Sequence, residues 1–170
     1  VFTAFCNNLA RLDPDLPSKE LTADQAAGAQ ALAAGVKAQT YGTTLLRGVT
    51  GSGKTNLAIA AIVDAHRRGL FVLVIVPSRV LINQWHERLT ALIPDCTVGR
   101  LGDDHRDHPE DCDVLITTRH SAASHRPVPP DGRGGLLVAD ECHGYGGGKL
   151  RRSLLKEYGA RLGLTATLAR

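Results

Sequence analysis

Apolar residues recur along the chain at helical spacing in two regions, which we expect to form helices. Residues Asn56 to Arg68 have the period and length of a helix, and Gly69 directly after them is typical of a helix end. A second helix is indicated by apolar residues three or four positions apart ahead of Pro94, namely Leu81, Trp85, Leu89 and Leu92.

Short apolar runs between these regions predict strands. The run from Leu70 to Val76 is unbroken, which is typical of a strand buried on both faces of a parallel sheet. Further strands are indicated at Thr43–Arg47, Thr97–Leu101, Val114–Thr117, Leu136–Ala139 and Arg161–Leu164. Strands that alternate with helices predict an α/β fold with a mostly parallel central sheet and helices on both of its faces.

The remaining segments complete the expected organisation. Thr22 and Gln25 have the spacing of a capping box, so the Ala-rich stretch to Lys37 is expected to be helical, as is Lys149 to Tyr158. Loops are expected over 102–113 and 124–135, because both are rich in polar residues, Pro or Gly. Residues 1–17 resemble a lead-in or linker, which leaves one domain over 18–170.

Composition narrows the class of protein. Hydrophobic residues make up 43% and charged residues 22% of the 170 residues, an ordinary globular balance. No apolar run is long enough to cross a membrane, so no membrane partner is expected. Four scattered cysteines without a CxxC pair favour a reducing, cytoplasmic location, and we find no signal peptide. A chain that opens at Val1 and lacks Met suggests processing or excision from a longer chain.

A glycine-rich turn between a predicted strand and a predicted helix has the G-x-x-x-x-G-K-T pattern of a phosphate-binding loop. Its glycines allow successive backbone N–H groups to point inward at a phosphate, and the following helix turns its positive end toward the same anion. Lys54 then adds a positive charge, and the Thr55 hydroxyl is a ligand for Mg²⁺. We therefore predict ATP and Mg²⁺ as cofactors, held by Gly48, Thr50, Gly51, Ser52, Gly53, Lys54 and Thr55.

A pair of acidic residues, Asp140 and Glu141, directly follows the apolar strand 136–139. A carboxylate at the end of a buried strand can reach a Mg²⁺ ion held by a phosphate loop on a neighbouring strand. Glu141 is then positioned to orient and deprotonate the attacking water. Alone, an acidic pair after a strand is more often part of a solvated loop, but downstream of a phosphate loop the catalytic interpretation is favoured.

Taken in order, these segments resemble the first RecA-like domain of superfamily-two DExH-box helicases and translocases, in particular excision-repair helicases and the motor subunits of restriction enzymes. The resemblance extends from residue 21 to residue 170 and includes LTADQ, GVTGSGKT, VPSRVLINQW, VGRLGDD, DVLITTRHSA, DECH and LTATLAR. Leu168 stands where these proteins often have Pro, and the segment around Gln25 lacks their usual aromatic neighbour.

The resemblance implies roles for individual residues. It places Gln25 against adenine, Lys54, Asp140 and Glu141 in ATP hydrolysis, and His143, Thr165 and Thr167 in coupling the nucleotide site to movement. It also implies that a nucleic-acid backbone is contacted by Arg79, Thr117, Thr118 and Ser121. Hydroxyls and an Arg at the carboxyl ends of strands are physically plausible phosphate partners.

Three features of the sequence allow more than one interpretation. Arg79 alone could be a solvated charge at a helix start. Trp85 could stack on a base, although its helical register with neighbouring leucines favours core packing. The polar run 103–108 could bind a metal ion, but it lacks ligand spacing that would single it out.

The function expected from this resemblance is the ATP-binding half of an ATP-dependent nucleic-acid helicase or translocase, with DNA favoured over RNA. The net charge of +3 is compatible with such a partner without indicating one. Family members carry a second RecA-like domain whose arginines reach the γ-phosphate, so we expect such a domain in cis or in trans. The alternatives are a nucleotide-binding structural module of a larger assembly and an unrelated phosphate-loop enzyme such as a small-molecule kinase.

Overall fold

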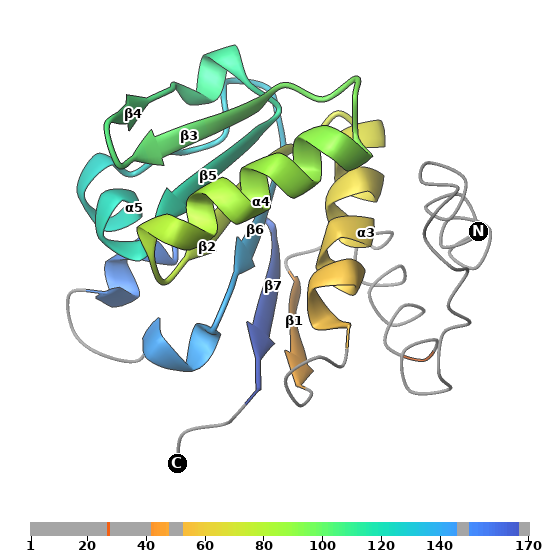
Figure 1. The fold of residues 1–170 in the computed structure, drawn as a ribbon, viewed down its shortest axis with the longest axis vertical. Helices are drawn as coiled ribbons and strands as arrows, with labels where there is room; N and C mark the ends of the chain where they lie inside the picture. Colours follow the sequence, from red (N-terminus) through yellow and green to blue (C-terminus); the bar gives the residue numbers. More distant parts are fainter. Residues whose placement is uncertain (1–26, 28–41, 48–52, 146–149, 167–170) are drawn as a thin grey trace.

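The computed structural model describes residues 27, 42–47, 53–145 and 150–166, and these contain a seven-stranded sheet (Figure 1). Its strands are β1 (Gly42–Arg47), β2 (Phe71–Val76), β3 (Val98–Gly102), β4 (His105–Arg106), β5 (Val114–Thr118), β6 (Gly135–Ala139) and β7 (Ala160–Thr165). They lie in the order β1-β7-β6-β2-β5-β3-β4. Every neighbouring pair is parallel except β3 and β4, so the predicted mostly parallel α/β sheet is confirmed.

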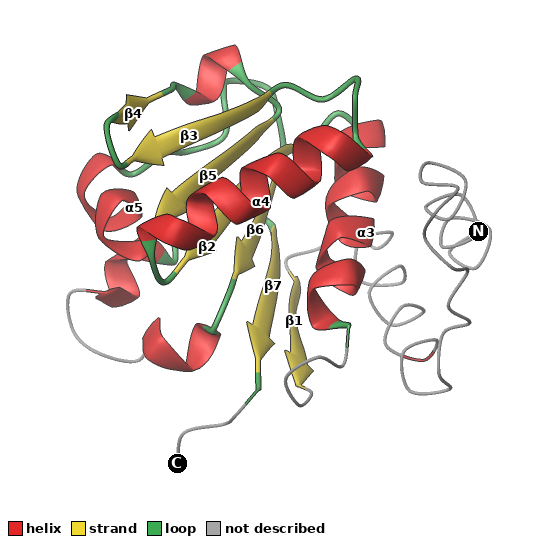
Figure 2. Cartoon of the chain, in the orientation of Figure 1, coloured by secondary structure: helices red, strands yellow, loops and turns green. Residues whose placement is uncertain are grey.

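Helices cover both faces of this sheet (Figure 2). The described residues contain α3 (Lys54–Arg67), α4 (Arg79–Leu92) and α5 (Arg119–His125), with short 3₁₀ helices η1 (Pro109–Asp111), η2 (Cys142–Tyr145) and η3 (Leu150–Ser153). Successive side chains of a strand point to opposite faces, and β2 alternates accordingly. Val72 and Val74 pack with α3 and α4 in one apolar cluster, whereas Phe71 and Leu73 pack with α5 and Tyr158 in another.

Two predicted helices agree with the structure within a few residues. The first begins at Lys54 rather than Asn56 and ends before Gly69, whose φ of 72° lies in the left-handed region that favours glycine at a helix end. In the second, α4, Trp85 and Leu89 point inward and are buried. The expected linker 1–17 and most of the expected helix 22–37 lie outside the described residues.

The predicted helix from Lys149 to Tyr158 is wrong. Among its described residues, 150–158, only η3 forms, and the chain then runs irregularly to β7. The Ser153 hydroxyl donates to the Leu150 carbonyl at 2.6 Å, a local side-chain bond that competes with helical pairing. Tyr158 is fully buried and donates its hydroxyl to the Pro127 carbonyl, so tertiary packing overrides the helical pattern.

The predicted loop 102–113 is only partly a loop, because β3 and β4 form a hairpin there. Asp103 and Asp104, the two residues that connect these strands, have φ values of 55° and 66°. Positive φ at both central residues is the geometry of a type I′ turn, for which Asn-Gly is the usual sequence signal. The helix α5 was also missed by the sequence analysis. It is short and begins after Thr118, whose hydroxyl accepts a hydrogen bond from the Ser121 N–H.

Strand order corrects one expectation about the nucleotide site. The strand that precedes the phosphate loop, β1, and the strand that precedes the acidic pair, β6, are not neighbours, because β7 lies between them and pairs with both. Thr165, the last residue of β7, therefore lies between the phosphate loop and the acidic pair.

None of the helices described here combines the length and the apolar character that crossing a membrane requires.

A candidate nucleotide site at the carboxyl edge of the sheet

The carboxyl ends of the parallel strands β1, β7 and β6 share one edge of the sheet, and the predicted catalytic residues follow them. Gly53 has a φ of 85°, a conformation that favours glycine, and α3 begins at the next residue, Lys54. Thr55 follows in the first turn of that helix. Several predicted site residues lie outside the described residues, namely Gln25, Gly48, Thr50, Gly51, Ser52 and Thr167.

Asp140 is held in a fixed orientation at the end of β6. Its backbone N–H donates to the Ile75 carbonyl of the adjacent β2 at 2.9 Å. Its carboxylate accepts hydrogen bonds on both oxygens, from the Glu141 N–H to Oδ1 at 3.0 Å and from the indole N–H of Trp85 to Oδ2 at 3.2 Å. Contacts with β2, with α4 and with the next residue of the chain thus determine where this carboxylate points.

The electrostatics of Asp140 suit a cation site. Burial raises the pKa of this carboxyl above its ordinary value, and the two hydrogen bonds and the charge of Lys54 counteract that effect only in part. A buried carboxylate with incompletely compensated charge gains from a divalent cation beside it. Asp140 therefore fits the role of a Mg²⁺ ligand, and Lys54 is close enough to act on it electrostatically.

Glu141, His143 and Thr165 form a polar group between β6 and β7. The His143 Nδ1 lies 3.1 Å from the Thr165 hydroxyl oxygen and 3.3 Å from the Glu141 carboxylate oxygen Oε2. Thr165 is fully buried at the end of β7, whereas about two-fifths of the Glu141 side chain is exposed. The arrangement connects a carboxylate that faces solvent to the buried end of β7, the strand between β1 and β6.

The short helix η2 that carries His143 is anchored from two sides. The Tyr145 hydroxyl donates to the Ile75 carbonyl at 3.0 Å, and the Arg119 guanidinium donates to the Gly144 carbonyl at 3.4 Å. A Cβ atom at Gly144 would lie 2.6 Å from a nitrogen of Arg119, so a side chain at this position would displace the Arg119 guanidinium. The anchors keep the segment after Glu141 close to α5.

Three of the four residues predicted to contact nucleic acid line one hollow at the same edge of the sheet. The hollow has a volume of about 300 Å³ and is lined by Pro77, Ser78, Arg79, Asp103, Thr118, His120 and Ser121. The Arg79 side chain is 74% exposed and lies 3.4 Å from the carboxylate of Asp103. Arg79, Thr118 and Ser121, which come from different elements, are therefore brought together.

The fourth residue, Thr117, is placed differently. Its side chain is fully buried, and its hydroxyl donates to the Leu101 carbonyl of β3 at 2.9 Å. A buried hydroxyl that is already bonded to the backbone is not available to an external phosphate. The structure therefore does not favour the predicted backbone contact for Thr117 and gives its hydroxyl a role in pairing β5 with β3.

Trp85 is the functional neighbour that the sequence analysis missed. Its side chain is 3% exposed and packs in the cluster between α3, α4 and the sheet, which confirms core packing over base stacking. Its hydrogen bond to Asp140 bridges 55 positions of sequence. No local pattern indicates this pairing, although an indole N–H in a core position usually has a partner.

Comparisons with known proteins agree with this geometry. Residues 18–170 match the family described as "Type III restriction enzyme, res subunit". Two proteins named "Putative DNA 3'-5' helicase Rad25" are similar to this chain. The one from Halobacterium salinarum is 39% identical over 128 residues, which cover 74% of this chain and 21% of that protein. The one from Haloarcula marismortui is 36% identical over 134 residues, which cover 76% of this chain and 20% of that protein.

The chain thus spans about a fifth of the length of these curated relatives. Among solved structures, it is similar to the Sulfolobus solfataricus SWI2/SNF2 ATPase core, which was solved in complex with dsDNA. The TM-score is 0.68 at 23% identity, over 88% of this chain and 32% of that one. This likeness confirms the RecA-like fold.

Proposed function

Because this chain belongs to the family described as type III restriction enzyme, res subunit, we propose that it is the ATP-binding part of an ATP-dependent DNA helicase or translocase. The observation that carries this proposal is the group at the carboxyl edge of the sheet. Asp140 and Glu141 follow β6, Lys54 follows β1, and His143 contacts Thr165 at the end of the strand between them.

We assign Mg²⁺·ATP to this edge. Thr55 and Asp140 would hold the Mg²⁺ ion, which when bound neutralises charge on the transferred phosphoryl group. Lys54 and the start of α3 would bind the phosphates, because a helix amino end and a lysine both favour an anion. The buried, hydrogen-bonded carboxylate of Asp140 supports this assignment, since its orientation is fixed before any ligand binds.

Glu141 would orient the attacking water and accept its proton. Its side chain is partly exposed, so water can reach it, and its own backbone N–H donates to the Asp140 carboxylate. His143 contacts both this carboxylate and Thr165. We propose that this contact transmits the state of the nucleotide to β7 and, through Thr167 beyond it, to the rest of the motor.

We propose that the nucleic acid along which this protein moves is DNA. The two similar curated proteins carry the name "Putative DNA 3'-5' helicase Rad25", and the similar ATPase core was solved with double-stranded DNA. In this chain, Arg79 and Ser121 offer a guanidinium and a hydroxyl to one hollow, where the buried Thr118 hydroxyl donates to the Ser121 hydroxyl at 3.1 Å. Those groups are typical partners of a phosphodiester backbone.

Residues 18–170 would then form one RecA-like domain of a two-domain motor. A second such domain, in cis or in trans, would supply an arginine at the γ-phosphate. Fingers of this kind raise the rate of phosphoryl transfer about 10³- to 10⁵-fold in related enzymes. We therefore expect the isolated domain to bind Mg²⁺·ATP weakly and to hydrolyse it very slowly.

The test is ATP turnover by the longest native chain that contains this segment, with and without single- and double-stranded DNA and RNA. Glu141→Gln removes the proposed base, and Glu87→Gln makes the same chemical change on the exposed side of α4. We expect DNA to raise turnover several-fold, Glu141→Gln to abolish it, and Glu87→Gln to leave it unchanged.

ATP binding without turnover under every condition would instead favour a nucleotide-binding structural module. Turnover stimulated only by RNA would still support a nucleic-acid motor but would contradict the proposal that it acts on DNA. Turnover that survives Glu141→Gln would contradict the assignment of the base.

A further inference from the structure

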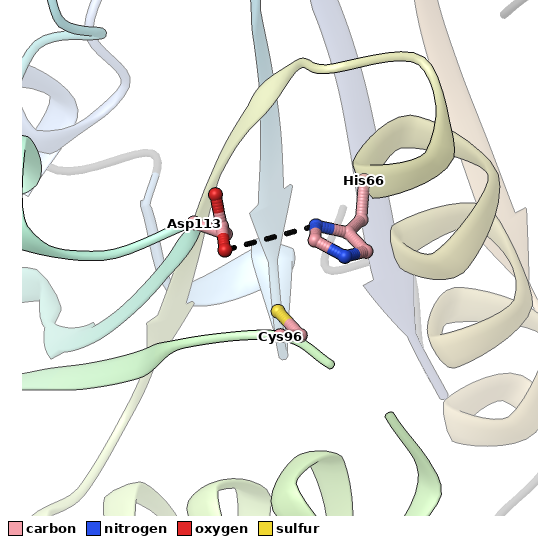
Figure 3. Close-up of side chains that lie close together, drawn as sticks. All are labelled: His66, Cys96 and Asp113. Atoms are coloured by element: carbon pink, nitrogen blue, oxygen red, sulfur yellow. Dashed lines mark ion pairs between the residues drawn. The ribbon is translucent and has the colours of Figure 1, made fainter. Parts of the chain in front are cut away.

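Three side chains that commonly bind transition metals converge at the opposite, amino edge of the sheet (Figure 3). His66 lies in the last turn of α3, Cys96 lies between α4 and β3, and Asp113 directly precedes β5. The imidazole, the thiol and the carboxylate each offer one ligand atom, and these atoms all lie within 4.8 Å of one another. The cluster is thus separate from the proposed nucleotide site.

The three groups face one another without a hydrogen bond between them. The His66 Nδ1 is 4.0 Å from Oδ2 of Asp113, too far for a hydrogen bond, and this buried nitrogen has no other hydrogen-bond partner. The Cys96 sulfur makes only a long contact of 4.0 Å with the Thr97 carbonyl. An orphaned ring nitrogen beside a buried sulfur and a carboxylate is an unusual arrangement for a site that holds nothing.

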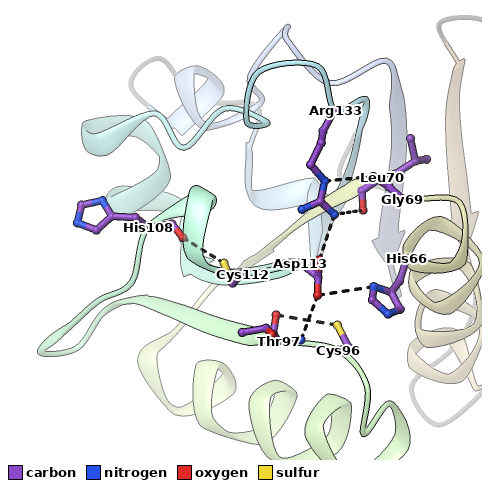
Figure 4. A network of polar contacts seen from close by, with 9 residues as sticks. All are labelled: His66, Gly69, Leu70, Cys96, Thr97, His108, Cys112, Asp113 and Arg133. Atoms are coloured by element: carbon purple, nitrogen blue, oxygen red, sulfur yellow. Dashed lines mark hydrogen bonds and ion pairs between the residues drawn. The ribbon is translucent and has the colours of Figure 1, made fainter.

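Asp113 is positioned by a second set of contacts (Figure 4). The Arg133 guanidinium donates to Oδ1 of Asp113 at 3.2 Å and is itself fixed by the backbone carbonyls of Gly69 and Leu70. The Thr97 N–H donates to Oδ2 at 3.2 Å. A carboxylate oxygen has two lone pairs, so Oδ2 keeps one for a further partner. Outer hydrogen bonds that orient a carboxylate are typical of metal sites.

We propose that His66, Cys96 and Asp113 bind a Zn²⁺-class transition-metal ion, with water in the fourth position. The donor set of one nitrogen, one sulfur and one oxygen suits Zn²⁺, whereas Mg²⁺ and Ca²⁺ prefer oxygen ligands. Zn²⁺ bonds of about 2.0–2.3 Å in a tetrahedron separate neighbouring ligand atoms by roughly 3.3–3.8 Å. The cluster therefore has to contract by about 1 Å, which side-chain rotation can supply.

The site would join the carboxyl end of α3 to the loops that precede β3 and β5. It would thus connect α3, the helix that starts at the phosphate loop, to the amino ends of strands β3 and β5. The competing explanation is a plain ion pair between protonated His66 and Asp113, in which Cys96 is only a buried apolar neighbour. The two explanations differ in whether Cys96 contributes a ligand.

Cobalt substitution distinguishes them, because Co²⁺ bound to a thiolate gives a charge-transfer absorption that histidine and carboxylate ligands do not. The metal-free full chain is titrated with Co²⁺ in the presence of excess Mg²⁺. Zn²⁺ is then added to displace the bound Co²⁺, which should remove the absorption. Cys96→Ser and His66→Asn each remove one proposed ligand. Cys112→Ser and Cys142→Ser make the matched thiol-to-hydroxyl change at the other two free cysteines in the described part of the chain.

We expect a saturable charge-transfer band in the native chain and in both controls, and its loss in Cys96→Ser. Changes to outer partners of a metal cost about 10–100-fold in affinity, so losing the direct ligand His66 should weaken binding at least as much. Zn²⁺ should also raise the melting temperature of the native chain and of Cys112→Ser, because a ligand of the folded state stabilises it. Far-ultraviolet circular dichroism verifies that each variant is folded.

Absence of the band in the folded native chain would overturn the proposal. A band of equal strength in Cys96→Ser, or one lost in Cys142→Ser, would locate the metal elsewhere and also overturn it. Where Cys96→Ser fails to fold, the band in His66→Asn and the Zn²⁺-dependent melting of the native chain still decide between the two explanations.

Discussion

The hydrogen bond from Trp85 to Asp140 leads to a prediction that separates orientation of a metal ligand from simple core packing. Trp85→Phe keeps an aromatic ring in the core but removes the indole N–H that donates to Oδ2 at 3.2 Å. Losing a hydrogen bond to a charged acceptor costs about 1.5–3 kcal/mol, and the smaller ring leaves a void that costs about 1 kcal/mol. Because Asp140 keeps some contact with solvent, we expect the free energy of unfolding to fall by about 2–3 kcal/mol.

The more informative effect is on Mg²⁺. The Trp85 hydrogen bond lowers the pKa of Asp140 against the dominant effect of burial, so its loss raises that pKa further. A carboxyl with a raised pKa binds its proton up to higher pH, and the acid limb of the turnover profile should therefore move to higher pH. If about 1.4 kcal/mol of the loss falls on the Mg²⁺-bound state, the Mg²⁺ needed for half-maximal turnover rises about tenfold.

The assay is Mg²⁺-dependent ATP turnover over a range of pH, beside denaturant unfolding. Phe71→Leu is the matched control, because Phe71 is fully buried on the opposite face of the sheet and packs against Tyr158. It should lower stability and leave the Mg²⁺ dependence unchanged. Trp85 is also the only tryptophan of the chain, so its fluorescence should respond to Mg²⁺·ATP. A Trp85→Phe enzyme with lowered stability but native Mg²⁺ and pH dependence would refute the reasoning.

Three further predictions concern other parts of the structure. Thr165→Val removes the hydroxyl 3.1 Å from His143 with little change of shape, so basal ATP turnover should persist while stimulation by DNA is lost; equal loss of both would argue against a coupling role. Gly102→Ala should lower the free energy of unfolding by about 1–3 kcal/mol in a denaturant titration, because φ is 103° there and the new Cβ would meet the Ser121 hydroxyl at 2.7 Å; native stability would contradict this. Burial raises the pKa of the Cys112 thiol to about 12, so at neutral pH iodoacetamide should alkylate it only after unfolding, as followed by mass spectrometry, and rapid alkylation of the folded protein would refute this.

The sequence is most informative where one residue type repeats with a clear period. The apolar run that forms β2 and the helical spacing of Trp85 and Leu89 predict their elements because burial dominates there. Lys149 to Tyr158 has a helical pattern too, but burial of Tyr158 and the hydroxyl bond of Ser153 determine its conformation instead. A local pattern cannot report such distant contacts.

In the candidate site, too, the sequence predicts residues that belong to local motifs but not contacts that depend on tertiary packing. Lys54, Asp140 and Glu141 were found because their chemistry follows a local motif in the sequence. The partner of Asp140, Trp85, was not found because the pair is joined only by the packing of α4 on the sheet. The insertion of β7 between β1 and β6 is likewise a property of strand order, which the sequence of each strand does not encode.

The backbone conformation of Glu141 lowers stability at a residue that is proposed to act in catalysis. This residue has a φ of 47°, in the left-handed region, and its carbonyl accepts the Gly144 N–H at 3.0 Å in a tight turn. A side chain in that conformation costs about 1–2 kcal/mol, which a glycine would not incur. Selection for thermal stability alone would therefore favour glycine at this position and eliminate the proposed base. A strained glutamate at this position fits a functional role that a glycine could not fulfil.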